Sequence, residues 1–179
     1  QNNNPIWIDC PEVPTNGIVR INSELTDVPE PRDLVKSLSY WNSYQYFNIW
    51  VVNSLPDSDG NMLLGYAQFP WSGSMSTEGV AIRASEFKNG KTLTHEVGHW
   101  LNLDHTWGGN NNPGNTSSCG TDDNVQDTPT CIGVQSCAMN SNTCTTDNAY
   151  WGFDIRDNVE NYMDYSYCSK MFTEGQRTR

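Results

Sequence analysis

All three histidines of this 179-residue chain fall in one short segment, "HEVGHWLNLDH" at 95–105. His95 and His99 are four residues apart, so on an α-helix their rings project from the same face about one turn apart. His105 comes after Asn102, a residue type that interrupts helices, so the chain can turn there and present a third imidazole nitrogen. The spacing therefore predicts a helix over about 92–101, followed at once by a turn.

This histidine spacing is typical of a zinc site. Two histidines at i and i+4 can serve as neighbouring ligands of a tetrahedral zinc ion, and three histidines leave the fourth position open for water, as in catalytic rather than structural sites. Glu96 directly follows the first histidine, where a carboxylate can act as general base on a zinc-activated water. The plainer interpretation is an exposed helix with solvated histidines, but His105 and the lack of any histidine elsewhere in the sequence argue against it.

The amino-acid composition limits the classes of binding partner. The formal net charge is −11 and the sequence pI is about 4.4. No basic patch is available to displace counterions, which argues against nucleic acids and anionic membranes as partners. No stretch approaches the roughly 20 apolar residues of a membrane span. The acidity suits cationic substrates and bound calcium, although much of it can equally be a solvated surface that favours solubility.

The six cysteines indicate disulfides formed in an oxidising compartment. None of them forms a Cys-x-x-Cys pair, and five lie in the C-terminal third, which is rich in loop-forming residues. Crosslinks would hold such loops, and they are typical of secreted proteins. Six cysteines allow fifteen connectivities, which spacing alone does not resolve.

The rest of the chain suggests one domain over residues 1–179 with two parts, an upper one at about 1–101 and a lower one at about 102–179. β-Branched and aromatic runs bounded by turn residues predict strands at 17–22, 46–52, 63–69 and 79–83. Apolar residues between Pro31 and Tyr40 suggest a short helix there. After Leu103 the chain consists largely of loop-forming residues, and loops of that length in a compact domain are usually functional or crosslinked.

Several motifs in order along the chain resemble the pappalysin family of metzincin zinc endopeptidases. They are "FNIWVV", "LLGYAQFP", "GKTLTHEVGHWLNLDHTWG", "CGTDDNVQDTP", "NYMDYS" and "MFTEGQ". The resemblance implies an α+β, metzincin-type fold. Its mixed, twisted sheet and active-site helix would form the upper subdomain, and the lower subdomain would be irregular and stapled by disulfides.

The resemblance also implies roles for individual residues. Met163 would lie beneath the zinc in the Met-turn, and the Tyr165 hydroxyl would reach the zinc or the tetrahedral intermediate, although simple core packing would explain both residues as well. Disulfides would join Cys119 to Cys144 and Cys137 to Cys168, which leaves Cys10 to pair with Cys131.

The resemblance further implies two binding segments. The segment 63–69 would be an edge strand whose backbone pairs with an extended peptide, through Gly65, Tyr66, Ala67 and Gln68. The acidic loop 119–129 would hold a structural calcium ion through oxygen ligands, from Asp123, Thr128 and the Val125 carbonyl. The alternatives are an ordinary edge strand and a merely solvated loop.

The chain departs from the family pattern in two places. Asn102 stands where the metzincin motif usually has Gly, so we expect Asn102 to adopt a left-handed conformation, which Asn enters more easily than most residues. The family's catalytic domains also usually carry a further strand and backing helix before the region where this chain begins, whereas only about 17 residues precede the segment 17–22 here. We expect an unusually short form, a trimmed fragment, or a domain to which these elements are supplied separately.

The favoured hypothesis is a secreted, monomeric zinc endopeptidase that acts on proteins or peptides, with a preference for a basic residue after the scissile bond suggested by the net charge. A calcium-dependent extracellular binding module with a non-catalytic zinc site is the alternative, but the presence of Glu96 argues against it. A zinc hydrolase acting on a non-peptide ester or amide is a third possibility, which the Met-turn and the peptide-binding strand disfavour.

Overall fold

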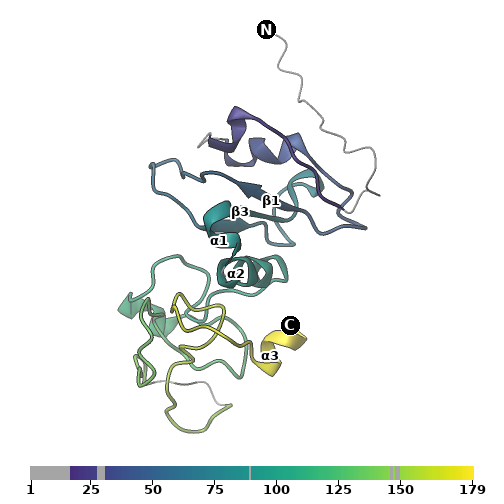
Figure 1. The fold of residues 1–179 in the computed structure, drawn as a ribbon. Coiled ribbons are helices and arrows are strands. Elements are labelled where there is room, and N and C mark those ends of the chain that lie inside the picture. Colours follow the sequence, from purple (N-terminus) through teal and green to yellow (C-terminus); the bar gives the residue numbers. More distant parts are fainter. Residues whose placement is uncertain (1–16, 28–30, 89, 146, 148–149) are drawn as a thin grey trace. The chain divides into compact units, whose positions relative to one another are not determined.

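The computed structural model describes residues 17–27, 31–88, 90–145, 147 and 150–179 (Figure 1). The chain forms two compact units, residues 1–92 and 93–179. Helix α2 (Lys91–Trp100) begins at the end of the first unit and lies almost wholly in the second. The sequence analysis placed this helix in the upper part of the chain, at about 1–101. No helix among the described residues is long and apolar enough to cross a membrane.

The first unit is built on a mixed sheet of three short strands, β1 (Ile49–Val52), β2 (Gly65–Ala67) and β3 (Val80–Arg83). The strand order is β1-β3-β2, in which β1 runs parallel to β3 and β2 runs antiparallel to it. The predicted α+β class with a mixed sheet is therefore confirmed. β2 lies at the edge of the sheet, as the family resemblance implied, although it is shorter than the predicted segment 63–69.

The central strand carries the core of this unit. Val80, Ala81 and Ile82 are completely buried. A cluster of apolar and aromatic side chains packs around Ala81, with members from β1, β2 and the preceding segments: Val35, Trp50, Val52, Leu55 and Tyr66. Burying such side chains is the main source of stability for a small sheet.

A cation is buried beside this core. Lys36 lies in the 3₁₀-helix η2 (Arg32–Leu38), and its side chain is almost fully buried. Nζ donates to the Thr77 carbonyl at 2.7 Å, pairs with Asp33 at 2.8 Å, and lies over the Tyr66 ring. Burial lowers the pKa of this amine. The predicted helix at 31–40 thus forms, but as a tighter 3₁₀-helix.

One predicted strand is wrong. Residues 17–22 are irregular, and Ile18 is 58% exposed. A β-branched run becomes a strand when its side chains pack in a half-buried sheet, and this segment does not do so. Three other short elements complete the unit: η1 (Glu24–Asp27), η3 (Met75–Thr77) and α1 (Ala84–Phe87).

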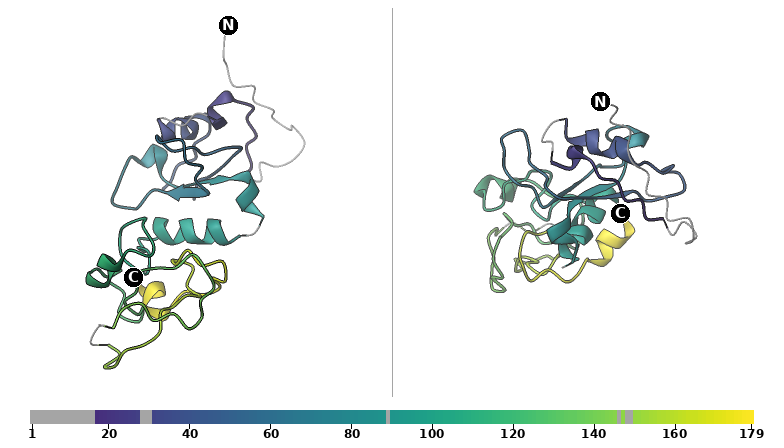
Figure 2. Two further views of the ribbon diagram at one scale, coloured as in Figure 1. Left: turned by 90° about the vertical axis from the view of Figure 1, so that its left-hand side faces the viewer. Right: turned by 45° about the horizontal axis from the view of Figure 1, so that its top comes forward.

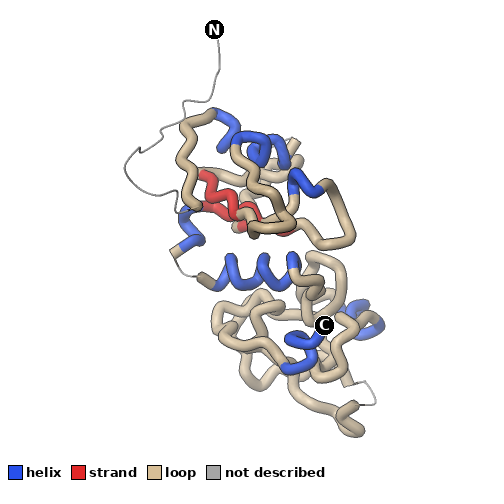
Figure 3. The backbone as a smooth tube through the Cα atoms, turned by 90° about the vertical axis from the view of Figure 1, so that its right-hand side faces the viewer, coloured by secondary structure: helices blue, strands red, loops and turns tan. Residues whose placement is uncertain are grey.

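The second unit is mostly loop after α2 (Figure 3). Its other regular elements among the described residues are η4 (Thr116–Gly120) and α3 (Glu174–Thr178). Disulfides join Cys119 to Cys144 and Cys137 to Cys168, the two pairs that the resemblance implied.

Carboxylates hold these loops as well. Asp157 accepts hydrogen bonds from the Ser141 hydroxyl and from both the backbone and hydroxyl of Thr143. Asp127 accepts from the Thr173 hydroxyl and the Gly175 backbone at the start of α3. In a sheet, neighbouring strands satisfy the backbone amides. In these irregular segments, the carboxylates accept hydrogen bonds from backbone amides instead.

Candidate metal centre

Helix α2 presents His95 and His99 from consecutive turns, and its length is visible in Figure 2. Their ring centroids lie 4.7 Å apart with the planes nearly perpendicular. Gly98, between them, allows the Met163 thioether to approach the helix, since a Cβ atom at Gly98 would lie 2.3 Å from the Met163 sulfur. Met163 is completely buried there.

Asn102 ends the helix in the left-handed conformation that the sequence predicted, with φ of 74°. The Asn102 amide donates to the His99 carbonyl and the Leu103 amide to the Gly98 carbonyl, both at 2.9 Å. These are the two bonds of a Schellman motif, in which Asn replaces the usual Gly. The turn reverses the chain and leads it to His105.

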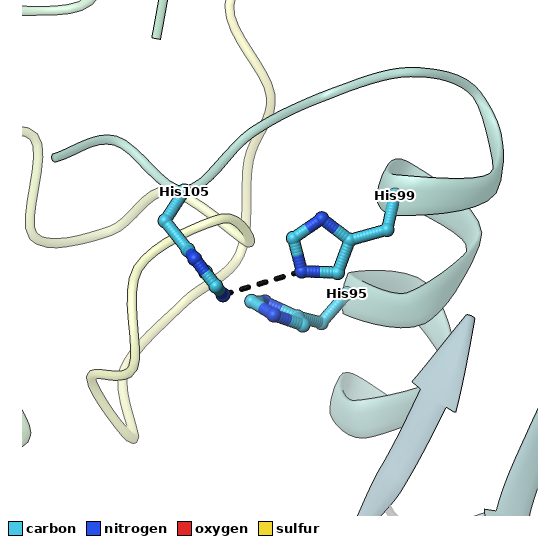
Figure 4. A group of neighbouring side chains, drawn as sticks. All are labelled: His95, His99 and His105. Carbon is cyan, nitrogen blue, oxygen red and sulfur yellow. Dashed lines mark hydrogen bonds between the residues drawn. The ribbon is translucent and has the colours of Figure 1, made fainter. Parts of the chain in front are cut away.

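The three histidines converge at one point (Figure 4). Their possible ligand atoms all lie within 4.8 Å of one another, and the Nε2 atoms of His99 and His105 are 3.2 Å apart. Two nitrogens bound at 2.0–2.1 Å to one tetrahedral zinc ion would be ~3.3 Å apart. The observed separation therefore fits two ligands of a shared zinc ion.

The protonation of these rings also suits a metal. His95 Nδ1 donates to the Tyr162 carbonyl at 2.6 Å and His99 Nδ1 to the Leu103 carbonyl at 2.7 Å, because a carbonyl oxygen can only accept. Each Nε2 therefore carries a lone pair. Burial lowers the pKa of His95 to about 4 and of His105 to about 2, helped by the neighbouring histidines, and lowers that of His99 too. All three rings are neutral at pH 7.

Glu96 and Tyr165 flank the centre. Glu96 is buried on α2 beside His95. The Tyr165 ring lies 5.4 Å from that of His95 and 5.0 Å from that of His105. Burial, and next the negative charge of Glu96, raise the pKa of Tyr165 to about 12. The phenol is thus protonated at neutral pH and lies close enough to Glu96 to feel its charge.

Asp164, next to Met163 in the sequence, forms hydrogen bonds within the protein. Its carboxylate accepts from the Val134 and Ser166 amides and from the Thr106 hydroxyl, and burial raises its pKa to about 6. These bonds link the residue after His105 to the turn that contains Met163. Asp164 therefore has a structural role, because it connects three segments around the site.

The three residues predicted to hold calcium also come together. Asp123, Val125 and Thr128 are buried. The Thr128 hydroxyl oxygen lies 2.7 and 2.9 Å from the two Asp123 carboxylate oxygens and 2.8 Å from the Val125 carbonyl oxygen. Burial raises the pKa of Asp123 to about 7.

The predicted substrate strand lies in the first unit. Gly65, Tyr66 and Ala67 form β2, and Gln68 follows it. The Tyr66 side chain is buried and its hydroxyl donates to the Arg32 carbonyl, so this side chain is held within the first unit. The Gln68 side chain is held by Ser74 and Thr77.

The third predicted disulfide involves Cys131. Its thiol is buried and free, and it donates to the Thr106 hydroxyl. Cys10, its expected partner, lies outside the described residues. The pairing of Cys10 with Cys131 therefore stays a prediction.

Sequence reasoning missed Trp107. This residue is completely buried and its ring stacks on that of His105. Its position two residues after the third histidine was a signal that the sequence offered.

A helix with two imidazoles, a turn to a third, and a buried methionine below define a centre of the metzincin class. The family model described as Peptidase_M43, Pregnancy-associated plasma protein-A, matches residues 32–179, so the chain belongs to this peptidase family. The resemblance found in the sequence is confirmed.

Related proteins agree with this assignment. The chain is 37% identical to an extracellular metalloprotease of Verticillium alfalfae, over 76% of this chain and 48% of that protein. It is 34% identical to an extracellular metalloprotease of Pyricularia oryzae, over 76% and 47% respectively. The chain thus spans about half the length of these curated relatives.

Among solved structures, the chain resembles mature mirolysin of Tannerella forsythia in complex with a cleaved peptide. The two share 36% identity with a TM-score of 0.64, over 83% of this chain and 57% of that one. The metzincin-type fold is therefore shown.

Proposed function

We propose that this chain is the catalytic part of a secreted zinc endopeptidase that hydrolyses peptide bonds in proteins. The convergence of three neutral imidazoles, two of them buried, beside Glu96 and Tyr165 carries the proposal. The extracellular metalloproteases among its relatives and the cleaved peptide bound to mirolysin support it.

His95, His99 and His105 would hold the zinc ion. When bound, zinc supplies a Lewis acid that polarises a carbonyl group and makes water a nucleophile near neutral pH. Glu96 takes the proton of the attacking water and passes it to the leaving amine, as a general base and then a general acid. Tyr165, protonated at neutral pH, donates a hydrogen bond to the oxygen of the tetrahedral intermediate. Met163 forms the apolar floor beneath the ligands.

The peptide would be gripped by backbone pairing. β2 uses one side for β3, so the other side can pair with an extended peptide in a largely sequence-independent way. We further propose a preference for basic residues after the scissile bond, supported by the net charge of −11. We do not assign Asp164 as the acid that would bind a basic substrate residue, because its carboxylate already accepts hydrogen bonds from three donors within the protein.

Cleavage-site mapping tests the activity. Wild-type protein should cut an unfolded protein substrate, a zinc chelator should stop the cutting, and Glu96→Gln should lower kcat roughly 10²–10⁴-fold while zinc remains bound, because only the general base is lost. Glu174→Gln, at an exposed site, is the matched control. Zinc-loaded, folded wild type that makes no cuts would favour a binding module, and full turnover by Glu96→Gln would refute the mechanism.

We also propose a structural calcium ion at Asp123, Val125 and Thr128. One hydroxyl faces three acceptor oxygens but has a single proton to donate, so a cation would satisfy the oxygens better. The buried carboxylate has no ammonium or guanidinium group within ion-pair distance of its side chain among the described residues.

The pH dependence of stability tests this site. The pKa of Asp123 is about 7 in the folded chain against 3.8 as the ordinary value, so the folded protein binds the extra proton between these limits. Stability without calcium should therefore fall as the pH rises through this window, and the gain in Tm on adding calcium should grow. Asp123→Asn should abolish the growth of the calcium effect with pH. The fall in stability that remains should be the part contributed by Asp164, whose pKa burial raises to about 6, and it is opposed by the histidines, whose pKa burial lowers. A calcium effect that is equal at pH 5 and pH 8 would contradict the assignment.

A further inference from the structure

The third histidine is anchored differently from the other two. His95 and His99 each donate Nδ1 to a backbone carbonyl, which fixes the ring plane and the tautomer. His105 Nδ1 is buried and makes no hydrogen bond of normal geometry among the described residues, although the Asn110 and Gly108 backbones lie close enough to the ring to oppose the lowering of its pKa. An imidazole rotates freely about its terminal torsion unless something restrains it. His105 therefore needs another restraint.

Trp107 supplies a flat surface against this ring. The indole and imidazole rings are parallel within 4°, with centroids 4.4 Å apart. Trp107 is itself held in place: it is completely buried, and Nε1 donates to the Asn110 carbonyl at 2.9 Å. Gly133 abuts the indole so closely that a Cβ atom there would lie 2.2 Å from the ring. The indole is therefore a rigid support.

Tyr165 uses the same support. Its ring meets the edge of both Trp107 and His105 with centroids 5.0 Å apart and planes at 82° in each case. Such edge-to-face contacts are favoured aromatic arrangements. One indole thus contacts both His105, the third ligand of the proposed site, and Tyr165, two residues after Met163.

We propose that Trp107 is a positioning residue that orients His105 by stacking and aligns Tyr165 with it. The inference rests on the proposed zinc site, and it explains how a ligand without a hydrogen-bonded Nδ1 keeps its Nε2 aimed at the other two imidazoles. In this role Trp107 is not itself a ligand and acts through His105 and Tyr165.

Metal affinity and spectroscopy test the role of the indole. Trp107→Leu should weaken zinc binding 10- to 100-fold in competition with a chromophoric chelator, the range typical for residues that orient metal ligands. It should shift the visible absorption of the Co²⁺-substituted protein and lower kcat more than it raises KM. Trp107→Phe, which keeps an aromatic face, should recover most of the affinity.

Trp50→Phe is the matched control, because this buried indole also donates to a carbonyl, that of Ser39, but lies in the first unit. Its zinc affinity and Co²⁺ spectrum should equal those of wild type. Melting of the metal-free proteins identifies any variant that fails to fold.

A glycine pair tests the same support without changing the indole. Gly133→Ala would push a methyl group into Trp107, whereas Gly114→Ala imposes a similar positive φ with nothing within 4 Å. Zinc affinity should fall in Gly133→Ala and not in Gly114→Ala. If wild type binds zinc and cleaves peptides but Trp107→Leu and Gly133→Ala bind zinc as tightly as their controls, the positioning role is refuted while the proposed function stands. If wild type binds no zinc, the proposed function fails first.

Discussion

The two units of this chain are ordered by different forces. Residues 1–92 bury a continuous apolar strand, β3, among aromatic and aliphatic neighbours. Residues 93–179 contain few regular elements after α2, and they are held by two disulfides and by carboxylates that accept backbone hydrogen bonds. The difference shows that the second unit brings its three histidines together without a large sheet. It needs one helix and crosslinked loops.

Removing both disulfides should produce the largest effect. Cys119–Cys144 and Cys137–Cys168 close loops of 25 and 31 residues. Chain entropy assigns about 3.5 kcal/mol to each, or roughly 7 kcal/mol together. Replacing all four cysteines by serine should therefore abolish amide protection in the second unit, while β1 and β3 keep theirs in hydrogen-exchange measurements.

Cys131→Ala is the control for this experiment, because it removes a buried thiol but no bridge. A loss of stability as large as that of either disulfide would mean that Cys131 is crosslinked. Equal loss of protection in both units after removal of the four cysteines would mean that the units do not differ as described.

Ile82→Ala should break the first unit with an intermediate effect. Ile82 is completely buried in β3, and truncation of such a side chain costs about 2–5 kcal/mol in unfolding free energy. Urea unfolding should show this loss, and hydrogen exchange should place it in the first unit. Val51→Ala, at a half-exposed position on β1, should change stability by less than about 1 kcal/mol. Similar losses for both variants would argue against a sheet-centred core.

Thr173→Ala should have the smallest effect, in the second unit. Thr173 caps α3 by accepting from the Gln176 amide and also donates to Asp127. Loss of such a cap costs about 1 kcal/mol. The midpoint of thermal unfolding should fall slightly, and Thr173→Ser should restore it. No change in Thr173→Ala would mean that polar contacts contribute less to this unit than its structure suggests.

The sequence predicted the local features of the centre well. That His95 and His99 share a helix face follows from helix geometry, which is set within a few residues, and the left-handed turn at Asn102 was expected from the Gly that the metzincin motif usually has there. The family resemblance supplied what depends on distant contacts, such as the pairing of Cys137 with Cys168 and the convergence of Asp123 with Thr128.

Other features were beyond prediction because they depend on packing. The apolar segment 17–22 has the composition of a strand, but strand formation requires packing within a sheet that local sequence does not encode. Lys36 has the composition of a surface residue, and only the fold places Asp33 and Thr77 around its amine. The stacking of Trp107 on His105 depends on ring orientation, which residue spacing does not specify.

The turn at Asn102 has a consequence for how such chains are found. What the site requires at this position is a backbone angle, φ of 74°, rather than the absence of a side chain. A search pattern that requires glycine three residues after the second histidine would miss this chain, although its three histidines still converge. A pattern that allows at this position every residue able to adopt a positive φ would find this chain. Such a pattern would define the motif by backbone conformation and not by residue type.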